Sequence, residues 1–429
     1  MQLRYNYRIN PTPGQRQALA RAFGCARTVF NDGLRARQGA RAAGLGYVSD
    51  AELSRRLTAA KATHERAWLS EVSAVVLQQA LADLNTAYRN FFNSCSGKRI
   101  GRRVAPPRFR SRKDNRQSIR FTRNARFTVT TGGKLRLPKI GDIPVRWSRE
   151  LPSGEPSSVT VTMDAAGRYH ASFVVETEDT PLPERTEEVG IDLGLTTFAV
   201  LSDGRKLDNP RFARRAARKL RKAQQASSRK QRGSRNRAKA RSKVAKCHAG
   251  VSNTRRDWLH KASTRIIRDN QAVYVEDLCV VGLARTRLAR SVHDAGWSTF
   301  VGMLAYKAAR HGRTFAKVDR WFPSTRVCSM CGVVGDKLAL SVREWTRRCG
   351  VVHDRDINAA RNILAAGRAE TPTPVELMSD RDLSRQSAQK QEPTGNRHPR
   401  VRQAGIPALQ GGEDVNGLCS RRRRGGRRR

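Results

Sequence analysis

Apolar and polar residues first alternate along this chain and then recur at helical spacing. The alternation at the N-terminus predicts a half-buried strand, whose apolar positions are Leu3, Tyr5, Tyr7 and Ile9. The run PTPGQ ends this strand, and Thr12 and Pro13 suit the cap and first turn of a helix. A second helix start follows at Ser49. We therefore expect residues 11–95 to form a helical lobe.

Strand patterns return beyond residue 116 and are separated by turn residues. The predicted strands are 117–122, 127–131, 134–137, SVTVTM and YHASFVVE. Together with the first strand they predict a small β-barrel made of residues 1–10 and 96–180, into which the helical lobe is inserted. The run DTPLPERTEE that follows has the composition of a linker.

Strands and helices alternate after residue 189, as is typical of an α/β domain. VGIDLGLTTFAVLSDGRKL predicts a strand, a tight turn and a returning strand, and QAVYVEDL predicts a buried strand. The amphipathic helix GWSTFVGMLAYKAARHG and the strand TFAKVD follow. The fold class is thus multidomain, α+β in the first half and α/β in the second. Residues 371–429 are polar, end in RRRRGGRRR and are expected to be a disordered basic tail.

The net charge of the sequence indicates what kind of partner the protein binds. The sequence has 84 Lys and Arg against 37 Asp and Glu, a formal net charge of +47. Such a surplus favours a polyanionic partner, nucleic acid first and an anionic membrane second. No apolar run is long enough to span a membrane, and the N-terminus lacks the apolar core of a signal peptide. We expect a cytoplasmic protein with no membrane partner, and eight scattered cysteines fit a reducing compartment.

Two basic segments stand out from the overall surplus. Residues 98–126 carry twelve Lys and Arg and one acid, and residues 211–246 carry sixteen and no acid. A charge run is often only a solvated face, but at this density phosphate binding is the better interpretation. The second segment should be mobile without a polyanion and helical with one. The candidate nucleic-acid contacts are Arg108, Arg110, Arg112, Lys113, Arg214, Arg218, Arg221 and Lys222.

Three acids are distinguished by their positions. Asp192 and Glu276 each end an apolar strand, and Asp356 precedes a helix. Burying an unpaired charge at a strand end is costly, so the first two acids suggest a site. An aspartate before a helix is also a common N-cap, so Asp356 alone is compatible with either role. Clustered carboxylates favour a hard divalent cation, and two such ions would suit phosphodiester hydrolysis.

The motifs around these acids resemble a known family. GIDLGL, VYVEDL and DRDINAARNIL occur in the order found in RuvC-type nuclease domains. With CSMCG between the second and third, the chain resembles the transposon-encoded TnpB proteins. These are RNA-guided DNA endonucleases related to type V CRISPR effectors and often labelled transposases. PPRFRSRK and AYRNFF also resemble the N-terminal half of that family, so the resemblance covers about residues 1–370.

The resemblance implies a fold and a chemistry. A RuvC or RNase H-like nuclease domain would comprise residues 185–325 and 350–370, with a zinc-finger-like insertion at 326–353. Asp192, Glu276 and Asp356 would be catalytic ligands of Mg²⁺, two ions in all, with Asp354 only a neighbour. The implied partners are a guide RNA transcribed from the transposon end and a double-stranded DNA target beside a short flanking motif. A monomer associated with a bacterial or archaeal nucleoid is expected.

The cysteines depart from the family pattern of two CxxC pairs. CSMCG keeps the first pair, but Arg347 stands where the third cysteine is expected. One possible Zn²⁺ site remains, and its ligands would be Cys328, Cys331, Cys349 and His353. A decayed knuckle that folds without metal is the alternative.

Two other functions remain open from the sequence. An RNA-guided DNA-binding repressor without cleavage would keep the same partners, although the three intact acids argue against it. A transposase that joins DNA strands is the other, and no tyrosine or serine nucleophile motif supports it.

Overall fold

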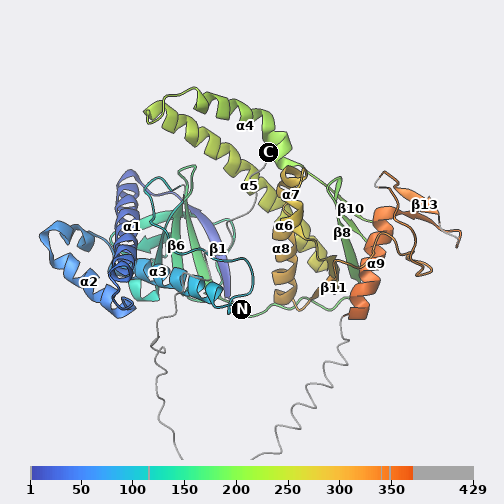
Figure 1. Cartoon of the computed structure of the whole chain (residues 1–429), viewed down its shortest axis with the longest axis horizontal. Helices are drawn as coiled ribbons and strands as arrows, with labels where there is room; N and C mark the ends of the chain where they lie inside the picture. The colour runs from blue at the N-terminus through green and yellow to red at the C-terminus, as the bar shows by residue number, and fades with distance from the viewer. Residues whose placement is uncertain (1, 115, 340, 347–348, 371–429) are drawn as a thin grey trace, which may run out of the picture. The chain divides into compact units, whose positions relative to one another are not determined.

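The computed structural model describes residues 2–114, 116–339, 341–346 and 349–370 (Figure 1). The predicted basic tail, residues 371–429, and Arg347 lie outside these described residues. The first half of the described chain carries a seven-stranded sheet and its helices, and the second half carries a five-stranded sheet and its helices.

The first sheet has the strand order β2-β6-β7-β1-β5-β4-β3, and every neighbouring pair is antiparallel. Its strands are β1 (Gln2–Ile9), β2 (Gln117–Thr122), β3 (Thr128–Val129), β4 (Lys134–Leu137), β5 (Gly141–Arg146), β6 (Ser158–Met163) and β7 (Tyr169–Glu176). The alternation in β1 is confirmed, because Tyr5, Tyr7 and Ile9 are buried and the residues between them are exposed.

The predicted closure of this sheet into a barrel is wrong. β2 and β3 stand at the two ends of the strand order, and no ladder joins them among the residues that the structure describes. β3 has only two residues, both exposed, so it offers little backbone or apolar surface for a further pairing. The sheet therefore stays open.

The helical lobe is inserted between β1 and β2, as predicted. It consists of α1 (Pro13–Ala42), α2 (Asp50–Ala62), the 3₁₀ helix η1 (His64–Glu71) and α3 (Ala74–Cys95). Thr12 caps α1 in a capping box, since its hydroxyl accepts from the Gln15 amide at 3.3 Å and the Gln15 side chain accepts from the Thr12 amide at 3.0 Å. Ser49 likewise caps α2. Apolar side chains of the lobe and of the sheet share one core.

The second sheet has the order β10-β9-β8-β11-β12. β8 (Glu188–Leu193), β11 (Ala272–Glu276) and β12 (Thr314–Val318) are parallel, while β9 (Thr197–Leu201) and β10 (Lys206–Asp208) are antiparallel additions at one side. The crossovers contain α4 (Phe212–Ser228), α5 (Arg235–Asp269), α6 (Val280–Leu283), α7 (Ala289–Ala295) and α8 (Trp297–Arg310). The small hairpin β13 (Glu344–Thr346) and β14 (Val352–Asp354) leads into α9 (Arg355–Glu370).

Period-two alternation assigns opposite roles to the two faces of this sheet. Val273 and Val275 of β11 pack in a core with residues of α5 and α8. Ala272 and Tyr274, on the other face, pack with Ile363 of α9. The sheet therefore lies between helices on both sides, as parallel strands require.

Helix α9 approaches this sheet unusually closely at two glycines. A β-carbon on Gly190 of β8 would overlap the carbonyl oxygen of Ala360 and lie 2.5 Å from the amide nitrogen of Leu364. A β-carbon on Gly367 of α9 would overlap the ring of Tyr274 in β11. The absence of side chains at these two positions allows α9 to lie directly on β8 and β11.

Candidate metal centres and basic surface

The carboxylates of Asp192 and Glu276 end neighbouring parallel strands on the face that α9 covers. Ile191 of β8 pairs with Val275 of β11. The residues that follow them, Asp192 and Glu276, therefore lie at the same level of the sheet. Alternation places both acids on the same face as Gly190 and Tyr274, which contact α9. Asp356 lies in the first turn of that helix. The topology thus brings the three predicted acids to one edge of one face.

The three acids interact electrostatically. Burial raises the pKa of Asp192 to about 7, and the charges of Glu276 and Asp356 add to the increase. Burial also raises the pKa of Glu276, with a contribution from the charge of Asp277. Each additional negative charge at this edge opposes ionisation of its neighbours, as expected where a cation is the missing partner.

Asp277, next to Glu276, is compensated by the protein itself. Its carboxylate pairs with Lys317 at 3.1 Å and with Arg320. The hydrogen bond from Lys317 holds the pKa of Asp277 below its usual range. Asp277 is therefore committed to structural ion pairs, and Glu276 is the acid that acts on Asp192.

Asp354 caps the helix that carries Asp356. Its Oδ1 accepts hydrogen bonds from the backbone amides of Asp356 and Ile357, each at 3.0 Å, and its Oδ2 accepts from Lys206 at 2.6 Å. These bonds lower the pKa of Asp354 against the effect of burial. The capping role that the sequence left open for Asp356 thus falls to Asp354. Asp356 has a looser ion pair with Arg343, 3.4 Å away.

The three acids are of the chemical type that binds divalent cations, although among the described residues only Cys328, Cys349 and His353 have ligand atoms within 4.8 Å of one another. Carboxylate oxygens are the ligands that Mg²⁺ prefers, and Asp192, Glu276 and Asp356 can supply them without breaking a helix cap.

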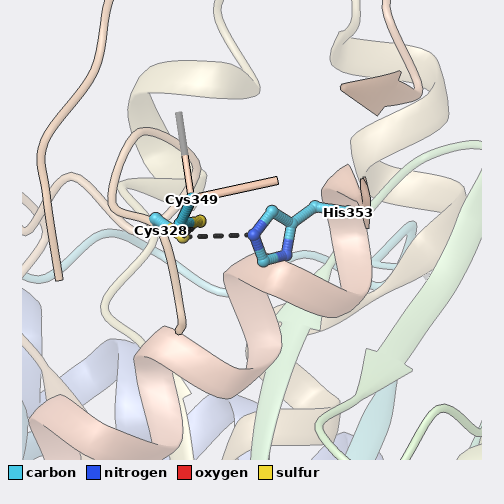
Figure 2. A group of neighbouring side chains, drawn as sticks. All are labelled: Cys328, Cys349 and His353. Atoms are coloured by element: carbon cyan, nitrogen blue, oxygen red, sulfur yellow. Dashed lines mark hydrogen bonds between the residues drawn. The ribbon is translucent and has the colours of Figure 1, made fainter. Parts of the chain in front are cut away.

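A second candidate metal centre consists of Cys328, Cys349 and His353. Their ligand atoms all lie within 4.8 Å of one another (Figure 2). The sulfur atoms of Cys328 and Cys349 are 3.8 Å apart, and Cys328 Sγ is 3.1 Å from His353 Nε2. Cys331, the fourth predicted ligand, is exposed and is not part of this group of three.

One of the two distances in this cluster fits zinc. A tetrahedral zinc would place the thiolate sulfur and the imidazole nitrogen about 3.5 Å apart, further than the 3.1 Å between Cys328 Sγ and His353 Nε2. Two thiolates bound at about 2.3 Å to one tetrahedral zinc have their sulfur atoms about 3.8 Å apart, which matches the observed separation. Burial of Cys328 raises its pKa, but amide hydrogen bonds from Cys331 and Met330 outweigh it and bring the pKa to about 6. Trp345 packs on the ring of His353 with centroids 4.6 Å apart, which restricts the orientation of the imidazole. The cluster itself offers two sulfurs and one nitrogen, and Cys331 stays a predicted fourth ligand.

Two asparagines of α9, the helix that carries Asp356, form hydrogen bonds with the backbone around Cys328. We call this segment, residues 324–331, the cysteine turn. Asn358 donates to the carbonyl of Val327 at 2.8 Å and accepts from the amide of Ser329 at 2.9 Å. Asn362, one turn later, donates to Val327 and Ser324, each at 2.7 Å. Sequence reasoning missed both residues, although their separation of four, in a run that is apolar apart from Arg361, was a signal.

The basic segment 211–246 forms the helix α4 and the first part of α5, which run side by side in opposite directions (Figure 1). Arg214, Arg218, Arg221 and Lys222 are all exposed on α4. The helix predicted for this segment is present in the structure, and its mobility without a polyanion stays a prediction. Alanines and Phe212 form its less exposed stripe, and the Phe212 ring contacts Trp258 of α5 with centroids 6.3 Å apart.

A buried aspartate anchors this basic hairpin. Asp294 of α7 accepts hydrogen bonds from the amides of Ala213 and Arg214 at 2.9 and 3.3 Å, and from Arg255 of α5 at 2.7 Å. It thereby caps the start of α4, where Arg211 occupies the N-cap in a left-handed conformation. A carboxylate at a helix N-terminus also complements the helix dipole. Sequence reasoning missed this residue, because the two partners are about 40 and 80 residues away.

The cations of the first basic segment, residues 98–126, are of two kinds: some pair with other side chains of the protein, and others are exposed to solvent. The guanidinium of Arg110 pairs with Asp83 at 3.2 Å and lies 3.8 Å from the centroid of Phe30. Arg110 is therefore held by the helical lobe, which makes it a weaker candidate for phosphate binding than predicted. Arg108, Arg112 and Lys113 are exposed.

The fold and the sites place this chain in a general class of proteins. It is a multidomain α/β protein with carboxylates at a sheet edge, a Cys/His cluster and a basic helical hairpin. In the parts of the chain that the structure describes, every helix is too short or too polar to cross a bilayer.

Comparisons with known proteins then identify the family. A family model described as "Probable transposase" (OrfB_IS605) matches residues 172–287, a "Cas12f1-like, TNB domain" matches 297–363, and a "Helix-turn-helix domain" matches 1–45. In this structure the last of these regions is one strand and one continuous helix, β1 and α1.

Two of the curated relatives match over nearly their whole length. A Streptomyces pristinaespiralis protein named "Putative RNA-guided DNA endonuclease" is 47% identical over 94% of this chain and 98% of its own. InsQ of Escherichia coli K12, named likewise, is 31% identical over 91% of this chain and 97% of its own. A solved Cas12f1–sgRNA–target DNA complex aligns with a TM-score of 0.48 and 12% identity over 80% of this chain and 81% of that chain. The sequence relatives alone show that the chain belongs to the TnpB (OrfB_IS605) family.

Because the pKa of Asp192 is raised, we predict that removing its charge stabilises the folded state, and that the size of this effect depends on pH. The folded state holds this proton more tightly than the unfolded state, so the stability that the proton contributes is complete below pH 4 and is lost as the pH rises towards 7. Without added divalent cation, Asp192→Asn should raise the free energy of unfolding by roughly 2–4 kcal/mol at pH 8 and by little at pH 4.

Chemical denaturation of both proteins at the two pH values measures this difference. Asp257→Asn is the control, since Asp257 is exposed and pairs only with Lys261, and it should change little at either pH. Equal stabilities of the wild type and Asp192→Asn at pH 8 would contradict the electrostatic description of the site.

The Cys/His cluster predicts about one zinc per chain. Cys328→Ser and His353→Ala should each lower the bound zinc well below one equivalent, because each removes a ligand of a four-coordinate site. Cys331→Ser should weaken binding at least tenfold if Cys331 is the fourth ligand. Cys95→Ser, an exposed thiol on α3, should retain full zinc in the same elemental analysis. Zinc-free wild type from metal-supplemented cells would favour the decayed knuckle.

Proposed function

We propose that this protein is an RNA-guided DNA endonuclease of a transposable element, with a RuvC-type nuclease site at Asp192, Glu276 and Asp356. The observation that carries the proposal is that Glu276 of β11 and Asp356 of α9 both act on the charge of Asp192 in β8. The names of its relatives and the polycationic composition support the nucleic-acid substrate.

The chain's own residues divide the work at this site. Bound Mg²⁺, expected as two ions, would supply the charge that polarises a phosphodiester and activates water. Asp192 and Glu276 provide ligand oxygens from the rigid sheet, and Asp356 provides one from α9. Asp354, as the cap of α9, and Asp277, in its ion pairs, hold the neighbouring backbone and basic side chains in place.

The basic hairpin and the exposed cations near residue 110 are the proposed contacts for the phosphate backbones of the guide RNA and the double-stranded DNA target. Four of them, Arg214, Arg218, Arg221 and Lys222, follow one exposed face of α4. In such systems base pairing reads the target, and the protein reads a short flanking motif. The guide would be transcribed from the transposon end, and the monomer would act on cytoplasmic or nucleoid DNA.

The acids provide the decisive test. Asp192→Ala and Glu276→Ala should each abolish cleavage of a guide-matched plasmid while retaining its binding, because these acids position metal and not the duplex. Asp356→Ala should be as inactive, whereas Asp354→Ala should lose stability and only part of its activity, since it removes a helix cap.

Cleavage and target binding should be measured on the same preparations. Cleavage by Asp192→Ala at the wild-type rate would overturn the assignment. Wild-type protein that binds the target and never cuts it would point to the repressor alternative instead.

The hairpin provides a second test. Changing Arg214, Arg218, Arg221 and Lys222 to Gln should weaken binding equally for every guide sequence and reduce the slope of log affinity against log salt by up to about 0.9 for each phosphate that is no longer neutralised. A control with the same change in charge replaces four exposed cations that pair with acids outside the two basic segments, namely Arg21, Arg55, Arg136 and Lys261. Titrations across salt concentrations compare the two, and identical slopes would mean that α4 is only a solvated face.

A further inference from the structure

One large aromatic side chain is exposed at the same sheet edge as the carboxylates. Trp321 follows β12 and is 84% exposed, whereas a tryptophan in a folded protein is usually well buried. Neither the carboxylate site, the Cys/His cluster nor the basic hairpin uses it. An indole exposed to this extent buries little apolar surface against the protein, so packing contributes little to its presence here.

The turn that carries Trp321 is nevertheless well fixed. The Asp319 carboxylate accepts a hydrogen bond from the Trp321 amide at 2.7 Å, and the Asp319 carbonyl accepts from the Phe322 amide at 3.1 Å. Phe322 packs inward against the core between the sheet and α9. The turn thus buries one aromatic ring and presents the next one to solvent, which lowers the entropy cost of binding through Trp321.

The position of Trp321 relative to the acids follows from the register of the sheet. Val318, the last residue of β12, pairs directly with Glu276 of β11. Trp321 is three residues further on, so its backbone lies within about 10 Å of Val318. Arg320 and Lys317, beside it, both pair with Asp277. The backbone of Trp321 thus lies near the carboxylate edge, next to two cations that pair with Asp277.

We propose that Trp321 is a stacking platform for an unpaired nucleobase of the DNA strand that approaches the carboxylates. The inference rests on the proposed nuclease function and adds to it a binding site for a base. An indole face stacks on any nucleobase, and neighbouring cations suit the phosphates on either side of it. The phosphodiester next to the stacked base would thereby be held near Asp192 and Glu276.

Binding of single-stranded 15-mers, measured without added Mg²⁺ by the purified full-length protein, tests this proposal. One probe is oligodeoxythymidylate, and the other has the same phosphates but an abasic centre. Trp321→Ala should weaken thymidylate binding by about 5- to 100-fold and abasic binding by much less. Trp321→Phe should lie between these values, because a smaller ring retains part of the stacking. Trp68→Ala, a control at a partly exposed tryptophan of the helical lobe, should change neither.

Each outcome decides the question. Equal losses on both probes, unchanged thymidylate binding, or no measurable binding of thymidylate by the wild type would overturn the stacking site. A change in sedimentation of Trp321→Ala with unchanged binding would instead indicate a protein contact. Cleavage by Asp192→Ala is scored separately, so failure of the nuclease proposal and failure of the stacking proposal give different results.

Discussion

The close contact between α9 and the parallel strands is the constraint on which the rest of the α/β half depends. Gly190 and Gly367 remove the two side chains that would hold the helix away from β8 and β11. Only at this separation can residues of α9 reach the sheet edge on one side and the cysteine turn on the other. A single helix therefore sets the relative positions of Asp356 and, through Asn358 and Asn362, of the candidate zinc ligands. A methyl group at either glycine would have to displace backbone or an aromatic ring, and both metal centres would move together.

The acids at the edge illustrate how a strongly basic protein can keep negative charge available. Two pairs of acids lie close together in sequence, and in each pair one member is neutralised by local partners. Asp277 is compensated by Lys317 and Arg320, and Asp354 by Lys206 and by the first amides of α9. Burial raises the pKa of Asp192, and the charge of the other member of each pair adds to this increase. The unfavourable free energy of bringing these charges together is thus concentrated around Asp192, where a bound cation would offset it.

Local signals in the sequence predicted most elements, because caps and alternation act over a few residues. Thr12 and Ser49 start helices as expected, and the strands at 117–122 and 134–137 have the predicted bounds. Strand pairings and hydrogen bonds between residues that are distant in sequence could not be predicted in this way. Pro144 obscured β5, whose pairing with β1 and β4 is decided by distant partners. The assignment of the cap to Asp354 and of the anchor to Asp294 likewise depends on which side chains the tertiary fold brings within hydrogen-bonding distance.

The order of the acids along the chain has a consequence for biosynthesis. Asp356 is translated 164 residues after Asp192, and the helix that carries it is the last element that the structure describes. At typical rates of synthesis this interval lasts on the order of ten to thirty seconds, and the N-terminal sheet and helical lobe can fold during it. The basic hairpin is also synthesised before the third acid. A nascent chain can therefore acquire its affinity for nucleic acid on the ribosome before its carboxylate cluster exists.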